Sequence, residues 1–240
     1  MSNDLENLIM KQMPTAERPL LGLTVLMVED SRFASEAMRL LCLRSGARIR
    51  RADNLKSAHK HLSVYRPSVV IVDLGLPDGS GAELIQDLAA ATPRVGVIFG
   101  ISGNDEGFEI AKAAGADGFF AKPIESLAKF QCAILKHLPP QAHPTGHCIM
   151  SQDQISPDPV ALRDDLVHIA DVLTTSAADD QVIDYVAQFL TGVARIAHDN
   201  PLEHAVATLA AHRASGLPFG SDVARIAGMV QDRLENRKVV

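Results

Sequence analysis

Acidic residues follow two apolar segments of the sequence. Asp73 comes directly after the run 68–72, and Glu29 and Asp30 come directly after the run 23–28. Such runs predict strands that are buried in a parallel sheet, and ligands bind outside the carboxyl ends of those strands. Three carboxylates at one sheet edge repel one another unless a cation lies between them. Their hard oxygen atoms suit Mg²⁺, so the sequence predicts a magnesium site there.

Two further segments end in polar residues that complement these acids. The run 95–101 ends at Ser102, and the short run 119–121 ends at Lys122. A carboxylate such as Asp73 can accept a phosphoryl group as an acyl phosphate. A lysine ammonium group neutralises the negative charge of a phosphoryl group during transfer, and a hydroxyl group can donate to it afterwards. The predicted edge therefore contains the groups that phosphoryl transfer to a carboxylate requires.

Taken together, the four strand ends resemble the receiver domain of two-component response regulators. The matching segments are 28–31, 72–79, 101–103 and 115–123, in the family's order and at its spacing within residues 21–138. The resemblance implies that Asp73 is the phospho-acceptor and that Lys122 binds the phosphoryl group. It also implies Ser102 as the phosphate-sensing hydroxyl and Phe119 as a switch aromatic. The Mg²⁺ ligands that it implies are Glu29, Asp30, Asp73 and the backbone carbonyl of Gly75.

Each of these residues also has an ordinary structural interpretation. An aspartate after a strand often caps the following turn, as Asp73 would in that case. Glu29 and Asp30 could simply favour the positive end of a helix that begins near Ser31. Phe119 could be a core residue like Phe120. The joint occurrence of four motifs favours the chemical interpretation over these separate ones.

Helical patterns lie between the strand runs, as a doubly wound sheet requires. They cover residues 33–45, 54–64, 81–91, 104–114 and 125–138. Residues 47–52 form the least apolar strand because three arginines surround Ile49, which is typical of a sheet edge. We therefore predict an α/β fold with a five-stranded parallel sheet of flavodoxin-like order 2-1-3-4-5 and helices on both faces.

The sequence changes character after Leu138. Residues 1–20 are expected to be an N-terminal extension, residues 21–138 the receiver domain, and residues 139–157 a proline-rich linker. Beyond the linker, apolar residues recur at helical spacing in four segments, and Asn200 and Pro201 mark the start of one of them. Residues 158–240 are therefore predicted to be a small all-α domain of four helices that serves output or dimerisation.

Charge narrows the role of the helical domain. Residues 151–240 contain 7 Lys plus Arg against 13 Asp plus Glu, whereas residues 1–150 contain 16 of each. DNA binding normally requires a basic face, so this balance argues against DNA as a partner, although a transcriptional regulator with DNA-binding helices stays an alternative. Residues 197–202 resemble the phospho-accepting helix of sensor kinases with two residues missing. A phosphorelay intermediate that uses His198 is therefore a second alternative.

These features predict a response regulator of a two-component phosphorelay. We expect a phospho-accepting signalling protein, not an enzyme, whose receiver assists its own phosphorylation and dephosphorylation. The expected donor is a sensor histidine kinase or a histidine phosphotransfer protein, and the expected output is a downstream protein target or a homodimer. The acidic start of the sequence does not fit an export signal, and no apolar run has the length of a membrane span. The expected location is therefore cytoplasmic, without a membrane partner.

Overall fold

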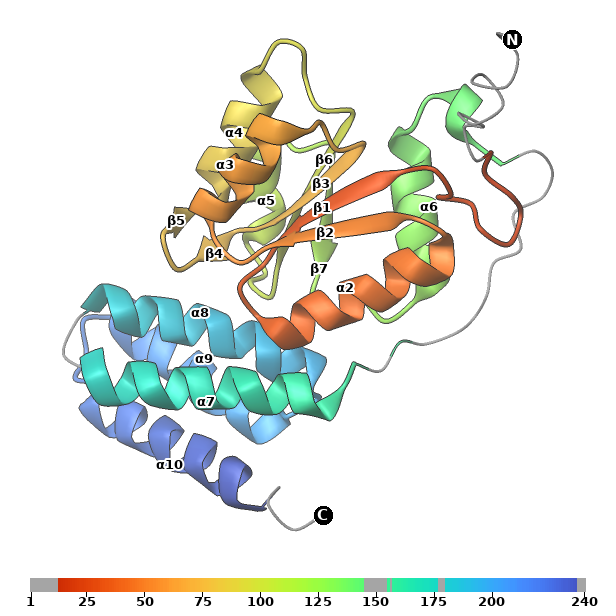
Figure 1. The fold of residues 1–240 in the computed structure, drawn as a ribbon. Coiled ribbons are helices and arrows are strands. Elements are labelled where there is room, and N and C mark those ends of the chain that lie inside the picture. The colour runs from red at the N-terminus through yellow and green to blue at the C-terminus, as the bar shows by residue number, and fades with distance from the viewer. Residues whose placement is uncertain (1–12, 145–154, 156, 177–179, 237–240) are drawn as a thin grey trace, which may run out of the picture.

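The apolar runs form a five-stranded parallel sheet in a computed structural model that describes residues 13–144, 155, 157–176 and 180–236 (Figure 1). Its order is β2-β1-β3-β6-β7, which confirms the predicted order 2-1-3-4-5 and places β2 at an edge. A two-stranded hairpin after β3 was not predicted, and it consists of β4 (Gly75–Leu76) and β5 (Gly79–Ser80). The sheet strands are β1 (Thr24–Val28), β2 (Arg48–Ala52), β3 (Val69–Asp73), β6 (Val97–Ser102) and β7 (Gly118–Ala121).

Helices cover both faces of the sheet because successive strand residues point to opposite sides. Val25 and Met27 pack with α2 (Arg32–Ser45) and α6 (Leu127–His137). Leu26 and Val28 pack on the other face, which is covered by three helices. These three are α3 (Leu55–Val64), α4 (Gly81–Ala90) and α5 (Gly107–Ala113).

Capping interactions define the first and last residues of the helices more precisely than the apolar pattern does. Helix α5 begins at Gly107, three residues after the predicted start, because the Asn104 side chain accepts a hydrogen bond from the Glu106 amide and forms a turn there. Helix α6 begins after Ser126, whose hydroxyl accepts from the Lys129 amide. Helix α2 ends at Ser45 and is followed by Gly46, which adopts the left-handed conformation of a glycine C-cap with φ 84°.

Four helices form the C-terminal part, as predicted. They are α7 (Pro159–Ser176), α8 (Asp180–Ile196), α9 (Asn200–Ala214) and α10 (Gly220–Asn236), and their apolar stripes share one core. Helix α9 begins at the predicted Asn200, but the identity of its N-cap needs a correction. Asp199, not Asn200, is its N-cap, because the Asp199 carboxylate accepts from the Leu202 amide. We name α7 to α10 the helical region.

The segments that flank the sheet contribute to its core. Leu20 is fully buried there, although the sequence places it in the N-terminal extension. In the linker, Pro140–Ala142 form one 3₁₀ turn (η1), and Ile155 packs into the same core. The remaining linker residues 145–154 and 156 lie outside the described residues. Within the described ranges, every helix is too short or too polar to cross a bilayer.

The helical region lies against the carboxyl edge of the sheet. Figure 1 shows α7 and α8 beside the start of α2, and α8 beside the β4–β5 hairpin. Phe33, in the first turn of α2, is buried in the core of the helical region and not under the sheet. The predicted site therefore faces the helical region and not open solvent.

Candidate functional site

The carboxylates of Glu29, Asp30 and Asp73 meet at the carboxyl edge of the sheet. Strands β1 and β3 pair in parallel, with Val28 opposite Val72, so the residues that follow both strands lie side by side. One carboxylate oxygen from each acid lies within 4.8 Å of the others. The structure thus brings together the three acids that the sequence indicated.

Lys122 supplies a cation inside this group of acids. Its Nζ lies 2.6 Å from Glu29 Oε2 and 3.1 Å from Asp73 Oδ2, and the lysine is buried. The Lys122 amide donates to the Ser102 carbonyl, which fixes the backbone beside the end of β6. Burial alone would lower the pKa of Lys122, but the nearby Asp73 and Glu29 carboxylates outweigh it and raise that pKa above its usual value. Lys122 is therefore a fixed positive charge at the site.

Glu29 is buried, Asp30 is partly buried, and both have raised pKa values. Burial, with repulsion from Asp73, raises the pKa of Glu29, while Lys122 opposes that rise. Burial raises the pKa of Asp30 to about 6. Asp30 Oδ1 is buried and has no hydrogen-bond partner in the part of the chain that the structure describes. An unpaired buried oxygen beside two more carboxylates fits the hard oxygen ligands that Mg²⁺ prefers.

Ser102 and Phe119 lie close to each other on the neighbouring strands β6 and β7. Ser102 is buried at the end of β6, and its Oγ accepts from the Asn104 amide at 3.0 Å. Gly107 separates Ser102 from the Phe119 ring, since a Cβ added to Gly107 would lie 2.8 Å from side-chain atoms of both. Phe119 packs nearly perpendicular to Phe108, with 6.2 Å between the ring centroids. The sequence did not single out Gly107, whose missing side chain leaves room for this arrangement.

The structure adds residues of α8 that the sequence did not indicate. The Tyr185 hydroxyl donates to Asp30 Oδ2 at 2.7 Å. The Gln188 amide group lies so close to Gly75 that a side chain at position 75 would overlap it. Helical spacing was the only signal for these residues, because Tyr185 and Gln188 lie three positions apart on one helix face. That spacing does not predict which surface this face of α8 contacts.

His198 lies away from the acids. It follows the end of α8 with φ 53°, and its Nε2 is 2.6 Å from Glu125 Oε1. Its side chain is 69% exposed. The structure therefore places His198 at a helix end, as the sequence indicated, and pairs it with Glu125.

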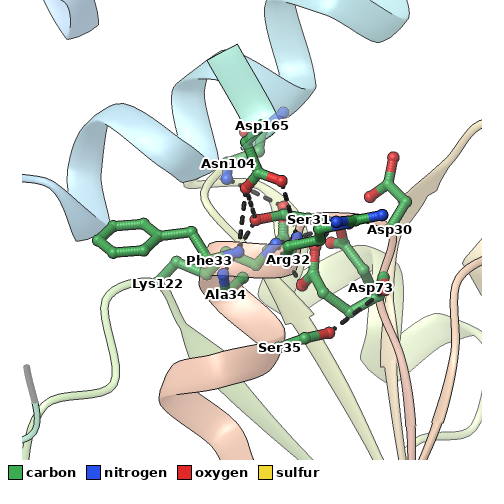
Figure 2. A network of polar contacts seen from close by, with 12 residues as sticks. Asp30, Ser31, Arg32, Phe33, Ala34, Ser35, Asp73, Asn104, Lys122 and Asp165 are labelled. Carbon is green, nitrogen blue, oxygen red and sulfur yellow. Dashed lines mark hydrogen bonds and ion pairs between the residues drawn. The ribbon is translucent and has the colours of Figure 1, made fainter. Parts of the chain in front are cut away.

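Asp165 of α7 caps the first turn of α2 (Figure 2). Its Oδ2 accepts from the Ser31 hydroxyl at 2.7 Å and from the Phe33 amide at 3.1 Å, and its Oδ1 accepts from the Arg32 amide at 2.8 Å. The first amides of a helix have no partner within the helix, and a negative charge there is favourable. Asp165 therefore joins the helical region to the element that directly follows Asp30.

We expect Asp165→Ala to loosen this junction, because it removes three hydrogen bonds to a buried carboxylate. The expected cost is about 3 kcal/mol, so the Arg32 and Phe33 amides should exchange with solvent roughly 100-fold faster. Hydrogen exchange followed by NMR measures this. Asp164→Ala is the matched control, because its carboxylate pairs only with the exposed Arg32 side chain among the described residues. Equal exchange rates in the two variants would contradict the proposed role of the cap.

Part of the chain matches a known family and several curated proteins. Residues 25–131 match the family described as response regulator receiver domain. The chain is similar to the KDP operon transcriptional regulatory protein KdpE of Escherichia coli, with 34% identity over 47% of this chain and 52% of that protein. It is 28% identical to the virulence transcriptional regulatory protein PhoP of Salmonella typhimurium over the same shares. The chain thus spans about half the length of these curated relatives.

A solved structure is similar over about half of the chain. It is the receiver domain of the sensor histidine kinase PA1611 from Pseudomonas aeruginosa, with a magnesium ion coordinated in its active site cleft. The identity is 21% and the TM-score is 0.43, over 48% of this chain and 95% of that one.

Proposed function

Residues 25–131 are a response regulator receiver domain, and from that premise we propose that Asp73 accepts a phosphoryl group in a two-component phosphorelay. The observation that carries the proposal is the contact of Lys122 Nζ with Asp73 Oδ2 at 3.1 Å, beside two further carboxylates. The donor is a sensor histidine kinase or a histidine phosphotransfer protein.

The transfer is a displacement at phosphorus. An Asp73 carboxylate oxygen attacks the phosphorus atom, a new oxygen–phosphorus bond forms, and the bond from phosphorus to the donor nitrogen breaks. Lys122 stabilises the negative charge on the phosphoryl oxygens, because its ammonium group is already held beside Asp73. Mg²⁺, held by Glu29, Asp30, Asp73 and the Gly75 carbonyl, would add charge neutralisation when bound.

The phosphorylated state ends by hydrolysis. Water attacks phosphorus, the bond to the Asp73 oxygen breaks, and inorganic phosphate leaves, which restores the carboxylate. The receiver thus assists its own phosphorylation and dephosphorylation, and the chain is a signalling protein and not an enzyme with an external substrate. Ser102 donates to the bound phosphoryl group, and Phe119 follows Ser102 inward as the switch aromatic.

The helical region carries the output. We favour a change of protein–protein contacts or of oligomerisation, because an acidic region opposes the DNA phosphates. The relatives KdpE and PhoP are transcriptional regulators by name, which keeps a DNA-binding output as the alternative. Phosphotransfer through His198 has less support, because that side chain pairs with Glu125 and not with the acids.

Chemical trapping on the full chain tests the phospho-acceptor. After incubation with acetyl phosphate and Mg²⁺, the intact mass should rise by one phosphoryl group, and hydroxylamine should remove it. Borohydride reduction should convert residue 73 to homoserine, which peptide mass spectrometry identifies. A product at another residue, or no product, would refute the assignment of Asp73.

A further inference from the structure

One face of α8 lies across the carboxyl edge of the sheet that contains Asp73, which we name the phospho-acceptor edge. Its four contact residues are spaced by three or four positions, so they share that face: Tyr185, Gln188, Gly192 and Arg195. Tyr185 contacts Asp30 at one end, and Arg195 contacts Asp105 and the Gly103 carbonyl at the other. The loops after β1 and after β6 are thus both in contact with α8.

The middle of this face lies closest to the reactive groups. A Cβ added to Gly103 would lie 3.2 Å from the Gly192 Cα, so the backbone of α8 packs directly on the loop after Ser102. A Cβ added to Gly192 would lie 3.4 Å from Lys122 Nζ. The Gln188 amide lies against Gly75, whose carbonyl is the proposed backbone ligand. Asp73 itself exposes only 6% of its surface.

Helix α7 completes the contact with a polar cap and an apolar anchor. The Asp165 carboxylate accepts from Ser31 and from the first amides of α2. The Phe33 side chain, 5% exposed, lies among the core residues of the helical region. An apolar side chain that leaves its own sheet for this core gains burial only while the two parts are together.

We infer that the surface formed by α7 and α8 is a binding surface for this chain's own phospho-acceptor edge and that it holds the edge closed. The inference rests on the proposed function of Asp73. In the closed arrangement the Tyr185 hydroxyl occupies a lone pair of Asp30, and α8 lies where a donor must approach Asp73. A phosphodonor therefore reaches the carboxylate only after α8 has moved away.

Linkage makes the closure a switch. Mg²⁺ and a phosphodonor bind only the open arrangement, so each of them increases the population of open molecules. Closure reduces the apparent affinity for both in proportion to the fraction of molecules that are open. Gln188 and Gly192 lie against Gly75, Lys122 and Gly103, the groups that would surround a phosphoryl group on Asp73. Phosphorylation therefore releases the surface of α7 and α8, and the coupling is reciprocal, since whatever binds that surface favours phosphorylation.

Two substitutions open the edge by different means, and each has a matched control in this chain. Tyr185→Phe removes the hydroxyl that donates to Asp30, and Tyr65→Phe alters the only other tyrosine, which lies in the loop after α3. Gly192→Leu places a side chain against Lys122 and Gly103. Gly228→Leu makes the same change on α10, where an added Cβ meets nothing within 4 Å.

The test measures Mg²⁺ affinity by isothermal titration calorimetry and the rate of labelling by acetyl phosphate, both on the full chain. We expect Tyr185→Phe to raise both about tenfold, since a hydrogen bond to a charged group is lost only in the closed state. Gly192→Leu should raise both at least tenfold, because overpacking also acts only in the closed state. Both controls should equal the wild type.

The outcomes separate this inference from the proposed function. Labelling of residue 73 at the wild-type rate in both variants, with unchanged Mg²⁺ affinity, would overturn the closure and leave Asp73 as the phospho-acceptor. A rise in Gly192→Leu without one in Tyr185→Phe would overturn the role of Tyr185. An absence of label at residue 73 in the wild type and in both variants would overturn the proposed function itself.

Discussion

Asp73→Asn is expected to abolish labelling of the chain by acetyl phosphate. The amide keeps the size of the side chain but has no anionic oxygen to attack phosphorus, so the loss should exceed a hundredfold and fall below detection. The fold should persist, because Lys122 keeps its 2.6 Å contact with Glu29 and one of three mutually repelling acids is neutral. Intact mass spectrometry after incubation with acetyl phosphate and Mg²⁺ measures the effect.

Asp87→Asn is the matched control for this experiment. Asp87 lies on α4 with its side chain exposed, and the substitution removes the same charge from the same part of the chain. It should label at the wild-type rate. If Asp73→Asn gained the same mass as this control, the phosphoryl group would have to reside on another residue, and the phosphorelay proposal would fail.

The sheet edge was predictable because the pattern that specifies it is local. Each strand is a short apolar run, and the residue that follows it lies at the carboxyl edge whatever the rest of the chain does. Asp73, Asp30 and Lys122 could therefore be assigned to one place from three separate segments. The start of α5 was missed because the turn at Asn104 depends on a single side-chain hydrogen bond.

The cover over the edge was not predictable for a physical reason. Tyr185 and Asp30 are 155 positions apart, and no periodicity connects them. The helical pattern of α8 shows which residues share a face, but a stripe of this kind can pack within its own bundle or against another surface. The same holds for Phe33, because its place at the start of a helical pattern does not show that its side chain lies in the core of the helical region.

The buried charges at the edge explain why the site needs both a cation and a cover. Burial and repulsion from the neighbouring carboxylates favour the protonated forms of Glu29 and Asp30, so the pKa values of both are raised. Lys122 offsets part of this cost inside the chain, and the Tyr185 hydroxyl satisfies one oxygen of Asp30. Without Lys122, the repulsion between the buried carboxylates of Glu29 and Asp73 would not be compensated by a cation of the chain.

Lys122→Met is therefore expected to destabilise the fold strongly at neutral pH. The substitution keeps the length of the side chain but removes the ammonium group that lies between Glu29 and Asp73. Breaking a buried ion pair from one side costs about 3–5 kcal/mol, because the remaining charge is left without a partner. Urea unfolding followed by circular dichroism measures the loss, since the chain contains no tryptophan for fluorescence.

The pH dependence of this loss identifies its electrostatic origin. The folded-state pKa of Glu29 is already above its unfolded value, and removal of Lys122 takes away an interaction that lowers it. The folded state then binds a proton more readily than the unfolded state, so stability is recovered as the pH falls through that raised pKa. We expect a clearly smaller loss at pH 5.5 than at pH 7.5. Lys129→Met, on an exposed position of α6, should change stability little at either pH. An equal loss for Lys122→Met at both pH values would mean that packing, not charge, holds the site together.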